Sequence, residues 1–146
     1  MRRIVGPLVL SIVLLLSGCA TDKRSDSLDR TLLEYANAVR WDGFEAAQQF
    51  VDPKVRDAHP ITDFDRQRFT QLRVSDYDEG TGAMAGGDPN EIRQTVNVGL
   101  VNIHTQAERH IIDHQVWKYD QVKNKWWLET GLPNLDETAP ANPNGY

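Results

Sequence analysis

Three histidines and one aspartate form the densest group of side chains suited to proton transfer or metal binding: His104, His110, Asp113 and His114. On a helix, His110 and His114 would lie one turn apart and could share a metal ion. On a strand they stand about 13 Å apart on one face, at about 3.3 Å per residue, with Asp113 on the other face. A zinc–imidazole bond is about 2.0–2.1 Å long, so a separation of about 13 Å is too large for the two histidines to share a zinc ion. The alternation of the segment favours a strand, so we expect no metal site, and His110 and His114 stay as candidate acid/base residues.

The sequence offers little for nucleophilic or phosphate chemistry. It contains one cysteine, Cys19, and no Gly-x-Ser-x-Gly motif. The glycine-rich segment 80–87 is followed by Asp88, Pro89 and a strand pattern, whereas a phosphate-binding loop opens into a helix. We therefore predict no cofactor and no catalytic nucleophile.

Aromatic residues are concentrated in two short segments near the end of the chain. A four-residue turn between them places Tyr119 opposite Trp126 and Trp117 opposite Leu128. Such cross-strand pairs contribute about 0.2–1 kcal/mol each, which favours this register over a two-residue turn. Alternation sends Trp127 to the other face of the hairpin, where an exposed tryptophan is a candidate contact for a partner or ligand.

The amino terminus has the three parts of a secretory signal. Arg2 and Arg3 precede an apolar run over residues 4–16, and small residues surround Cys19. The run has 13 residues and contains Pro7, whereas a membrane-spanning helix needs about 20 apolar residues. The segment therefore predicts an export signal and not a membrane span.

The motif Leu16-Ser17-Gly18-Cys19 resembles the lipobox of bacterial lipoproteins. The resemblance implies removal of residues 1–18 as a lipoprotein signal peptide, attachment of a diacylglyceryl group to Cys19 and, in Gram-negative bacteria, a third acyl chain on the new amino terminus. Ala20 in place of Asp implies an outer-membrane location facing the periplasm. Two or three acyl chains hold a protein stably on a bilayer, so the membrane is an expected partner.

Length and charge narrow the functional classes further. A chain of 146 residues fits one domain. Removal of residues 1–18 takes away two arginines and leaves 14 basic against 21 acidic side chains. This balance argues against nucleic-acid binding and leaves membrane anchoring to the acyl chains. Acylation of Cys19 would also leave no free thiol.

The mature chain is expected to begin with a polar tether over residues 19–27. Five apolar residues at helical spacing then predict an amphipathic helix: Leu28, Leu32, Tyr35, Ala36 and Val39. Asp42 and Glu45 form a capping-box-like pair that predicts a second helix ending near residue 51.

A change of periodicity predicts a sheet after these helices. The segment 53–65 is expected to be irregular or to form one short turn. Strands are predicted over 69–77, 92–104, 109–120 and 125–130, with a long connection over 78–90. The residues 136–146 are expected to form a disordered tail.

The last two predicted strands, Val116-Trp117-Lys118-Tyr119-Asp120 and Lys125-Trp126-Trp127-Leu128-Glu129, together with the helix over 33–41, resemble small NTF2-like (cystatin-like) domains. The resemblance covers about residues 28–135. It implies an α+β fold in which two N-terminal amphipathic helices pack on a curved antiparallel sheet of about four strands, one helix fewer than full-size members have. That family includes isomerases, dehydratases, transport factors and binding modules, so the fold alone does not determine function.

The sequence thus predicts a membrane-anchored envelope lipoprotein that acts as a non-catalytic binding module for an envelope protein or a cell-wall component. Two alternatives stay open: a small isomerase- or dehydratase-type enzyme that uses His110 or His114, and a carrier of a small apolar molecule. A cavity holding a histidine and a carboxylate would favour the enzyme, and an apolar cavity without them the carrier. A filled core with an exposed Trp127 would favour the binding module.

Overall fold

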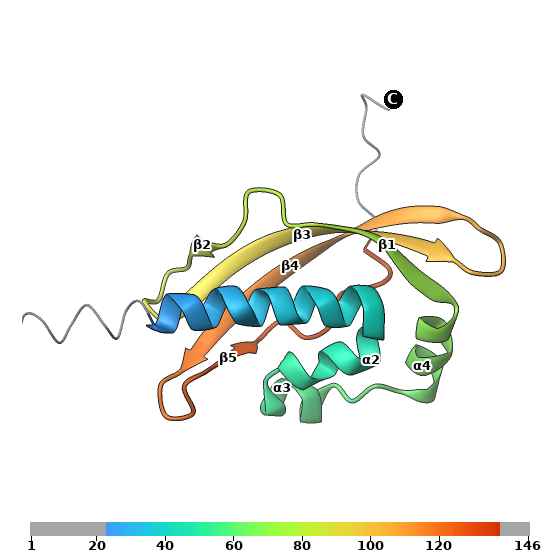
Figure 1. Ribbon diagram of the computed structural model, residues 1–146. Coiled ribbons are helices and arrows are strands. Elements are labelled where there is room, and N and C mark those ends of the chain that lie inside the picture. The colour runs from blue at the N-terminus through green and yellow to red at the C-terminus, as the bar shows by residue number, and fades with distance from the viewer. Residues whose placement is uncertain (1–22, 138–146) are drawn as a thin grey trace, which may run out of the picture.

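The computed structural model describes residues 23–137, which form an α+β domain with helices packed against a curled antiparallel sheet (Figure 1). The strand order is β1-β3-β4-β5. The bounds of these strands are β1 Leu72–Asp78, β3 Glu91–Asn102, β4 Glu108–Asp120 and β5 Lys125–Leu128. A short strand, β2 Met84–Ala85, pairs with β3 along the same edge as β1. The structure therefore confirms the predicted α+β class, with helices packed on a curved antiparallel sheet.

The two long strands, β3 and β4, follow the alternation seen in the sequence. Val96, Val98 and Leu100 of β3 are fully buried, whereas Arg93 and Thr95, which precede them on the strand, are exposed. In Figure 1 these strands arch over the N-terminal helix, and α2, α3 and α4 gather at one end of the molecule. The apolar face of the sheet thus lies against the helix, as predicted.

The hairpin of β4 and β5 has the predicted register. Tyr119 pairs with Trp126 and Trp117 pairs with Leu128 across the strands. The free edge of β5 is covered, because Val51 forms a parallel bridge to Leu128 and the next amide, that of residue 52, donates to the Leu128 carbonyl at 2.9 Å. The hairpin is thereby joined to the helical layer.

The N-terminal helix occupies residues 23–37 and continues as a wider π-helical segment, η1, over Ala38–Asp42. The predicted apolar stripe is confirmed, since all five of its residues are buried: Leu28, Leu32, Tyr35, Ala36 and Val39. The predicted polar tether over residues 19–27 is wrong in its end point, because residues 23–27 already belong to the helix. Residues 1–22 lie outside the part of the chain that the structure describes.

The predicted second helix is shorter and differently capped. It consists of α2, Phe44–Ala47, and a turn of 3-10 helix, η2, over Gln48–Phe50. The predicted Asp42 cap is wrong, because Gly43 is the N-cap residue and no side chain caps the helix. Gly43 has a φ of 88°, a left-handed value that glycine adopts without strain and that allows the chain to turn sharply out of η1.

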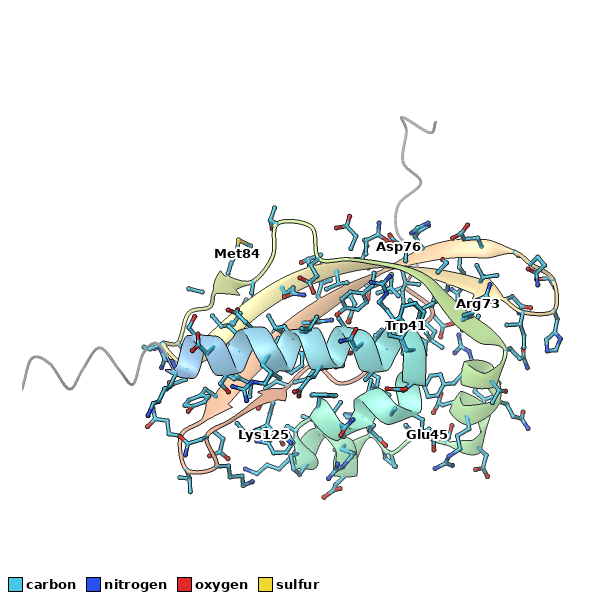
Figure 2. The ribbon with its side chains drawn as sticks, viewed as in Figure 1. Trp41, Glu45, Arg73, Asp76, Met84 and Lys125 are labelled. Carbon is cyan, nitrogen blue, oxygen red and sulfur yellow. The ribbon has the colours of Figure 1, made fainter. Side chains whose placement is uncertain are left out.

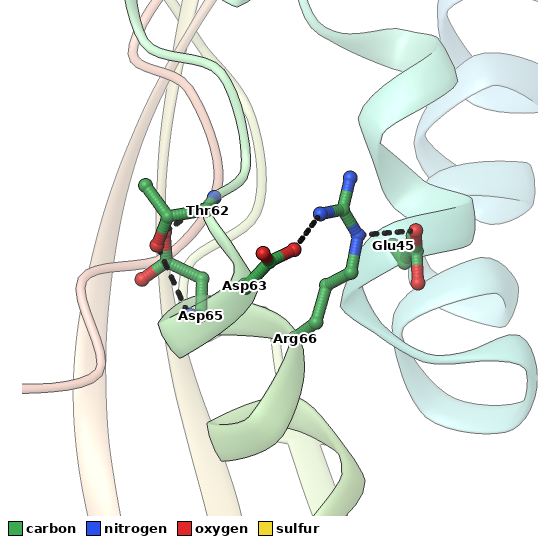
Figure 3. A network of polar contacts seen from close by, with 5 residues as sticks. All are labelled: Glu45, Thr62, Asp63, Asp65 and Arg66. Atoms are coloured by element: carbon green, nitrogen blue, oxygen red, sulfur yellow. Dashed lines mark hydrogen bonds and ion pairs between the residues drawn. The ribbon is translucent and has the colours of Figure 1, made fainter.

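Two further helices, α3 over Pro53–Ala58 and α4 over Asp63–Thr70, occupy the segment predicted to be irregular and the start of the first predicted strand. The expectation of two helices is therefore wrong. The start of α4 is defined by a capping box: the Thr62 hydroxyl accepts from the Asp65 amide at 3.2 Å, and the Asp65 carboxylate accepts from the Thr62 amide at 3.0 Å (Figure 3). Such reciprocal bonds satisfy two amides that a helix start leaves without partners.

One ion pair and one aromatic contact join α4 to α2, and a second ion pair lies within α4. Arg66 donates from Nε to the Glu45 carboxylate at 3.2 Å and from Nη1 to Asp63 at 2.9 Å (Figure 3). The rings of Phe44 and Phe69 pack with their centroids 5.3 Å apart. Because exposed ion pairs contribute little to stability, the aromatic contact is the more important of the two links.

Strand β1 contains a bulge at Ser75, where its pairing with β3 shifts by one residue. Gly99 of β3 lies directly against this bulge. A Cβ at position 99 would lie 2.6 Å from the Ser75 hydroxyl oxygen and 3.2 Å from the Asp76 amide nitrogen. The close approach of the two backbones therefore explains why residue 99 is a glycine.

The segment after β5 returns to the domain. Leu135 is buried, and the Arg109 guanidinium donates to its carbonyl. Asp136, predicted to open a disordered tail, pairs with Arg68 of α4 at 2.6 Å. The tail prediction is therefore wrong at residue 136, and residues 138–146 lie outside the described part of the chain.

Candidate functional site

The two candidate acid/base residues lie on the outer face of the sheet. The His110 ring is within 3.2 Å of the Asn97 side-chain oxygen, and the His114 ring is within 3.2 Å of the Thr95 hydroxyl. Both histidines are exposed, and neither lines either of the two cavities described below. The prediction that they share a face and that Asp113 points the other way is confirmed by the burial of Asp113.

Within residues 23–137 no three His, Cys, Asp or Glu side chains come together as ligands for a metal ion. None of the helices in the same range is both long and apolar enough to cross a bilayer. The predicted lipid-attachment residue, Cys19, precedes the described residues.

Trp127, the predicted recognition residue, is half-buried on the outer face of the hairpin. The Lys125 ammonium lies 4.0 Å from the centroid of its ring, and the Lys123 ammonium lies 5.6 Å from it. Its indole nitrogen is buried and has no hydrogen-bond partner. Trp127 is therefore covered by lysine side chains and does not present an open aromatic face.

A second tryptophan, Trp41, is far more exposed, with 74% of its surface accessible. It lies in η1, at the end of the N-terminal helical region that contacts β1, and is labelled in Figure 2. The Arg40 guanidinium lies 5.3 Å from the centroid of its ring. Sequence analysis missed this residue as a contact because helical periodicity assigned it only to the end of a helix.

The inner face of the sheet carries a buried polar cluster that sequence analysis also missed. Gln115 is at its centre: its amide nitrogen donates to an Asp113 carboxylate oxygen at 2.7 Å and lies 3.1 Å from the Tyr77 hydroxyl. Its carbonyl oxygen accepts from the Trp117 indole nitrogen at 3.1 Å. Asp113 and Gln115 are 5% and 1% exposed, so the cluster lies inside the core.

Burial shifts the acid–base behaviour of this cluster. Loss of hydration raises the pKa of the Asp113 carboxyl to about 6, although the bond from Gln115 and the nearby His114 act in the opposite direction. Burial likewise raises the pKa of Tyr77 and that of Tyr35, whose hydroxyl has no hydrogen-bond partner. Asp113 is thus a carboxyl that changes its charge close to neutral pH inside the core.

A groove of about 700 Å³ lies between α3, the connection to α4, and the segment after β5. Its walls combine apolar side chains such as Val55 and Ile61 with charged ones such as Arg56 and Arg68. A smaller cavity of about 280 Å³ lies where α4 meets the turn between β3 and β4. Neither cavity is lined by any residue of the buried polar cluster. The groove can therefore accept a segment of mixed polarity from a partner, whereas the polar cluster is part of the buried core.

Comparison of the chain with protein-family models, with curated proteins and with solved structures gives no match.

Proposed function

We propose that the protein is a bacterial envelope lipoprotein whose signal peptide, residues 1–18, is removed and whose Cys19 carries the acyl chains that hold it on the membrane. The observation that carries this proposal is the position of Leu16-Ser17-Gly18-Cys19 directly behind a 13-residue apolar run with two arginines in front of it. The residue after the cysteine, Ala20, favours the outer membrane and a domain that faces the periplasm.

The tethered domain acts as a binding module for an envelope protein or a cell-wall component. Its inner sheet face is filled, because Tyr35 and Trp117 are fully buried and stack edge to face at 5.2 Å. The open groove beside α3 and the exposed ring of Trp41 provide surface for a partner. These features favour binding at the surface over reaction in an enclosed pocket.

An NTF2-like relationship is part of the same proposal. A helix packed on a curved antiparallel sheet, and the Trp-x-Tyr-Asp hairpin in the predicted register, support it. The enzyme alternative has less support, since His110 and His114 contact Asn97 and Thr95 on the outer face. The carrier alternative has less support because the groove mixes charged and apolar walls.

Membrane extraction tests the anchoring. The protein is expected in the membrane fraction of the producing bacterium, retained through washes with about 1 M salt and released by detergent. At this salt concentration the Debye length is only about 3 Å, so attraction between exposed charges is weakened, whereas acyl chains stay in the bilayer. A protein that salt alone releases, or that is found in the soluble fraction, would contradict the proposal.

A further inference from the structure

The turn between β4 and β5 lies beside the start of the N-terminal helix (Figure 1). The Trp126 indole nitrogen donates to the Arg24 carbonyl at 3.3 Å, and the Arg24 guanidinium lies 5.9 Å from the centroid of the Tyr119 ring. Arg24 also donates to the Asn90 side chain at 3.0 Å. These contacts, and the pairing of Glu91 with Lys118, join residues 23–27, 88–93 and 118–127 into one end of the molecule, which we call the tethered end.

The tethered end is basic although the chain as a whole is acidic. It holds six basic side chains, Lys23, Arg24, Arg93, Lys118, Lys123 and Lys125, and four acidic ones, Asp26, Asp88, Glu91 and Asp120. The complete chain has 16 basic and 21 acidic side chains. Asp120 lies 3.7 Å from the Lys123 ammonium, so part of its charge is compensated. Positive charge is therefore concentrated at the end from which the chain continues towards Cys19.

The same end carries two apolar side chains among its lysines, the exposed Val122 and the half-buried Trp127. Val122 at the tip of the turn is 91% exposed. Lys118 pairs directly with Trp127 across the strands, and Lys125 lies two residues before Trp127, so all three share the outer face. The lysine ammonium groups that lie over the Trp127 ring belong to long, flexible side chains. Tryptophan amid lysines is typical of residues at a membrane–water interface.

The length of chain before the described residues limits the distance to the membrane. Three residues separate Cys19 from Lys23. A fully extended chain spans at most about 3.6 Å per residue, so the two residues lie no more than about 14 Å apart. With Cys19 acylated, the tethered end is the part of the domain nearest the bilayer.

We propose that the tethered end docks on the anionic phospholipid surface of the bilayer that holds Cys19, with its lysines at the headgroup phosphates and Val122 and Trp127 at the interface. The inference rests on the proposed lipid anchor. The acyl chains supply the stable attachment, and docking sets the orientation, so that the helical end with α3 and α4 points away from the membrane (Figure 1). Each lysine near an anionic surface strengthens docking about fivefold.

The test uses the lipidated protein, purified from membranes in detergent and reconstituted into vesicles of phosphatidylcholine alone or with about 30% phosphatidylglycerol. Val122→Cys carries an environment-sensitive fluorophore at the tethered end. The matched control, Ile103→Cys, carries it on the turn after β3, which is also exposed and lies at the other end of the sheet (Figure 1). Acylation blocks Cys19, so each label reports one site.

In phosphatidylglycerol vesicles the label at 122 is expected to shift its emission to shorter wavelength, and the label at 103 to stay unchanged. Replacing Lys118, Lys123 and Lys125 with Gln is expected to lower the ratio of docked to undocked protein on the order of 100-fold. Vesicle flotation without any lipid-dependent shift at 122 would overturn docking while the anchor stands. Failure to float with either vesicle would overturn the anchor, and the docking with it.

Discussion

Replacing Trp117 with alanine is expected to lower the free energy of unfolding by about 3–5 kcal/mol, the range for removing a large buried aromatic side chain. Trp117 is fully buried on β4 and packs edge to face against Tyr35 of the N-terminal helix at 5.2 Å. Its indole nitrogen also donates to the Gln115 side-chain oxygen. The substitution therefore leaves both a cavity between helix and sheet and a buried oxygen without its donor.

Urea unfolding followed by circular dichroism measures this change. The matched control is Trp41→Ala, the same substitution at a site that is 74% exposed. Its loss of stability is expected to stay below about 1 kcal/mol, because it removes little buried area and one exposed cation–π contact. Equal losses in the two variants would contradict the assignment of Trp117 to the contact between helix and sheet.

Stability should also depend on pH through Asp113. Its folded pKa of about 6 lies above the unfolded value of about 3.9. Between these values the folded state holds a proton that the unfolded state has lost. The favourable contribution of Asp113 is therefore fully present below about pH 4 and is lost as the pH rises through about 6. From about pH 4.5 to about pH 7.5 this amounts to about 2 kcal/mol.

Comparison with Asp113→Asn isolates this effect, since asparagine keeps an oxygen that can accept from Gln115 but cannot ionise. Unfolding of both proteins is measured at the two pH values. The stability of the wild type relative to the variant should fall by about 2 kcal/mol at the higher pH, whereas other titrating groups act on both proteins alike. A constant difference, or one that rises with pH, would show that the carboxyl is not held in a water-poor site.

The sheet was largely predictable because its signals are local and repeat every two residues. In β3 the alternation of Val96, Val98 and Leu100 with polar residues sets the buried face. In the hairpin the aromatic pairs select one turn length, and the structure has that register. Similarly, a stripe at helical spacing was enough to identify the buried face of the N-terminal helix.

The helices α3 and α4 were not predictable in the same way, because neither contains a fully buried residue and neither shows a clear apolar stripe. The Thr62–Asp65 capping box was visible in the sequence as a Thr followed three residues later by an acid. The β-forming character of Phe69 and Thr70 outweighed it, and both residues belong to α4. Here a contact distant in sequence, between Phe69 and Phe44, overrides local propensity.

The buried polar cluster was partly foreseeable. Asp113 and Gln115 alternate in phase with Ile111 and Trp117, so strand periodicity already places both on the inner face. The sequence alone does not show that Tyr77, from a strand about forty residues earlier, places its hydroxyl next to Gln115. His110 and His114 were predicted as acid/base residues from their residue type, whereas the carboxyl whose pKa is raised by burial is that of Asp113.

Mass spectrometry of the purified protein tests most directly whether Cys19 carries the membrane anchor. The expected mature chain begins at Cys19, lacks residues 1–18 and has a mass increased by two or three acyl chains. The Cys19→Ser variant should carry no acyl chain. An intact amino terminus at Met1 with an unmodified Cys19 thiol would contradict the account.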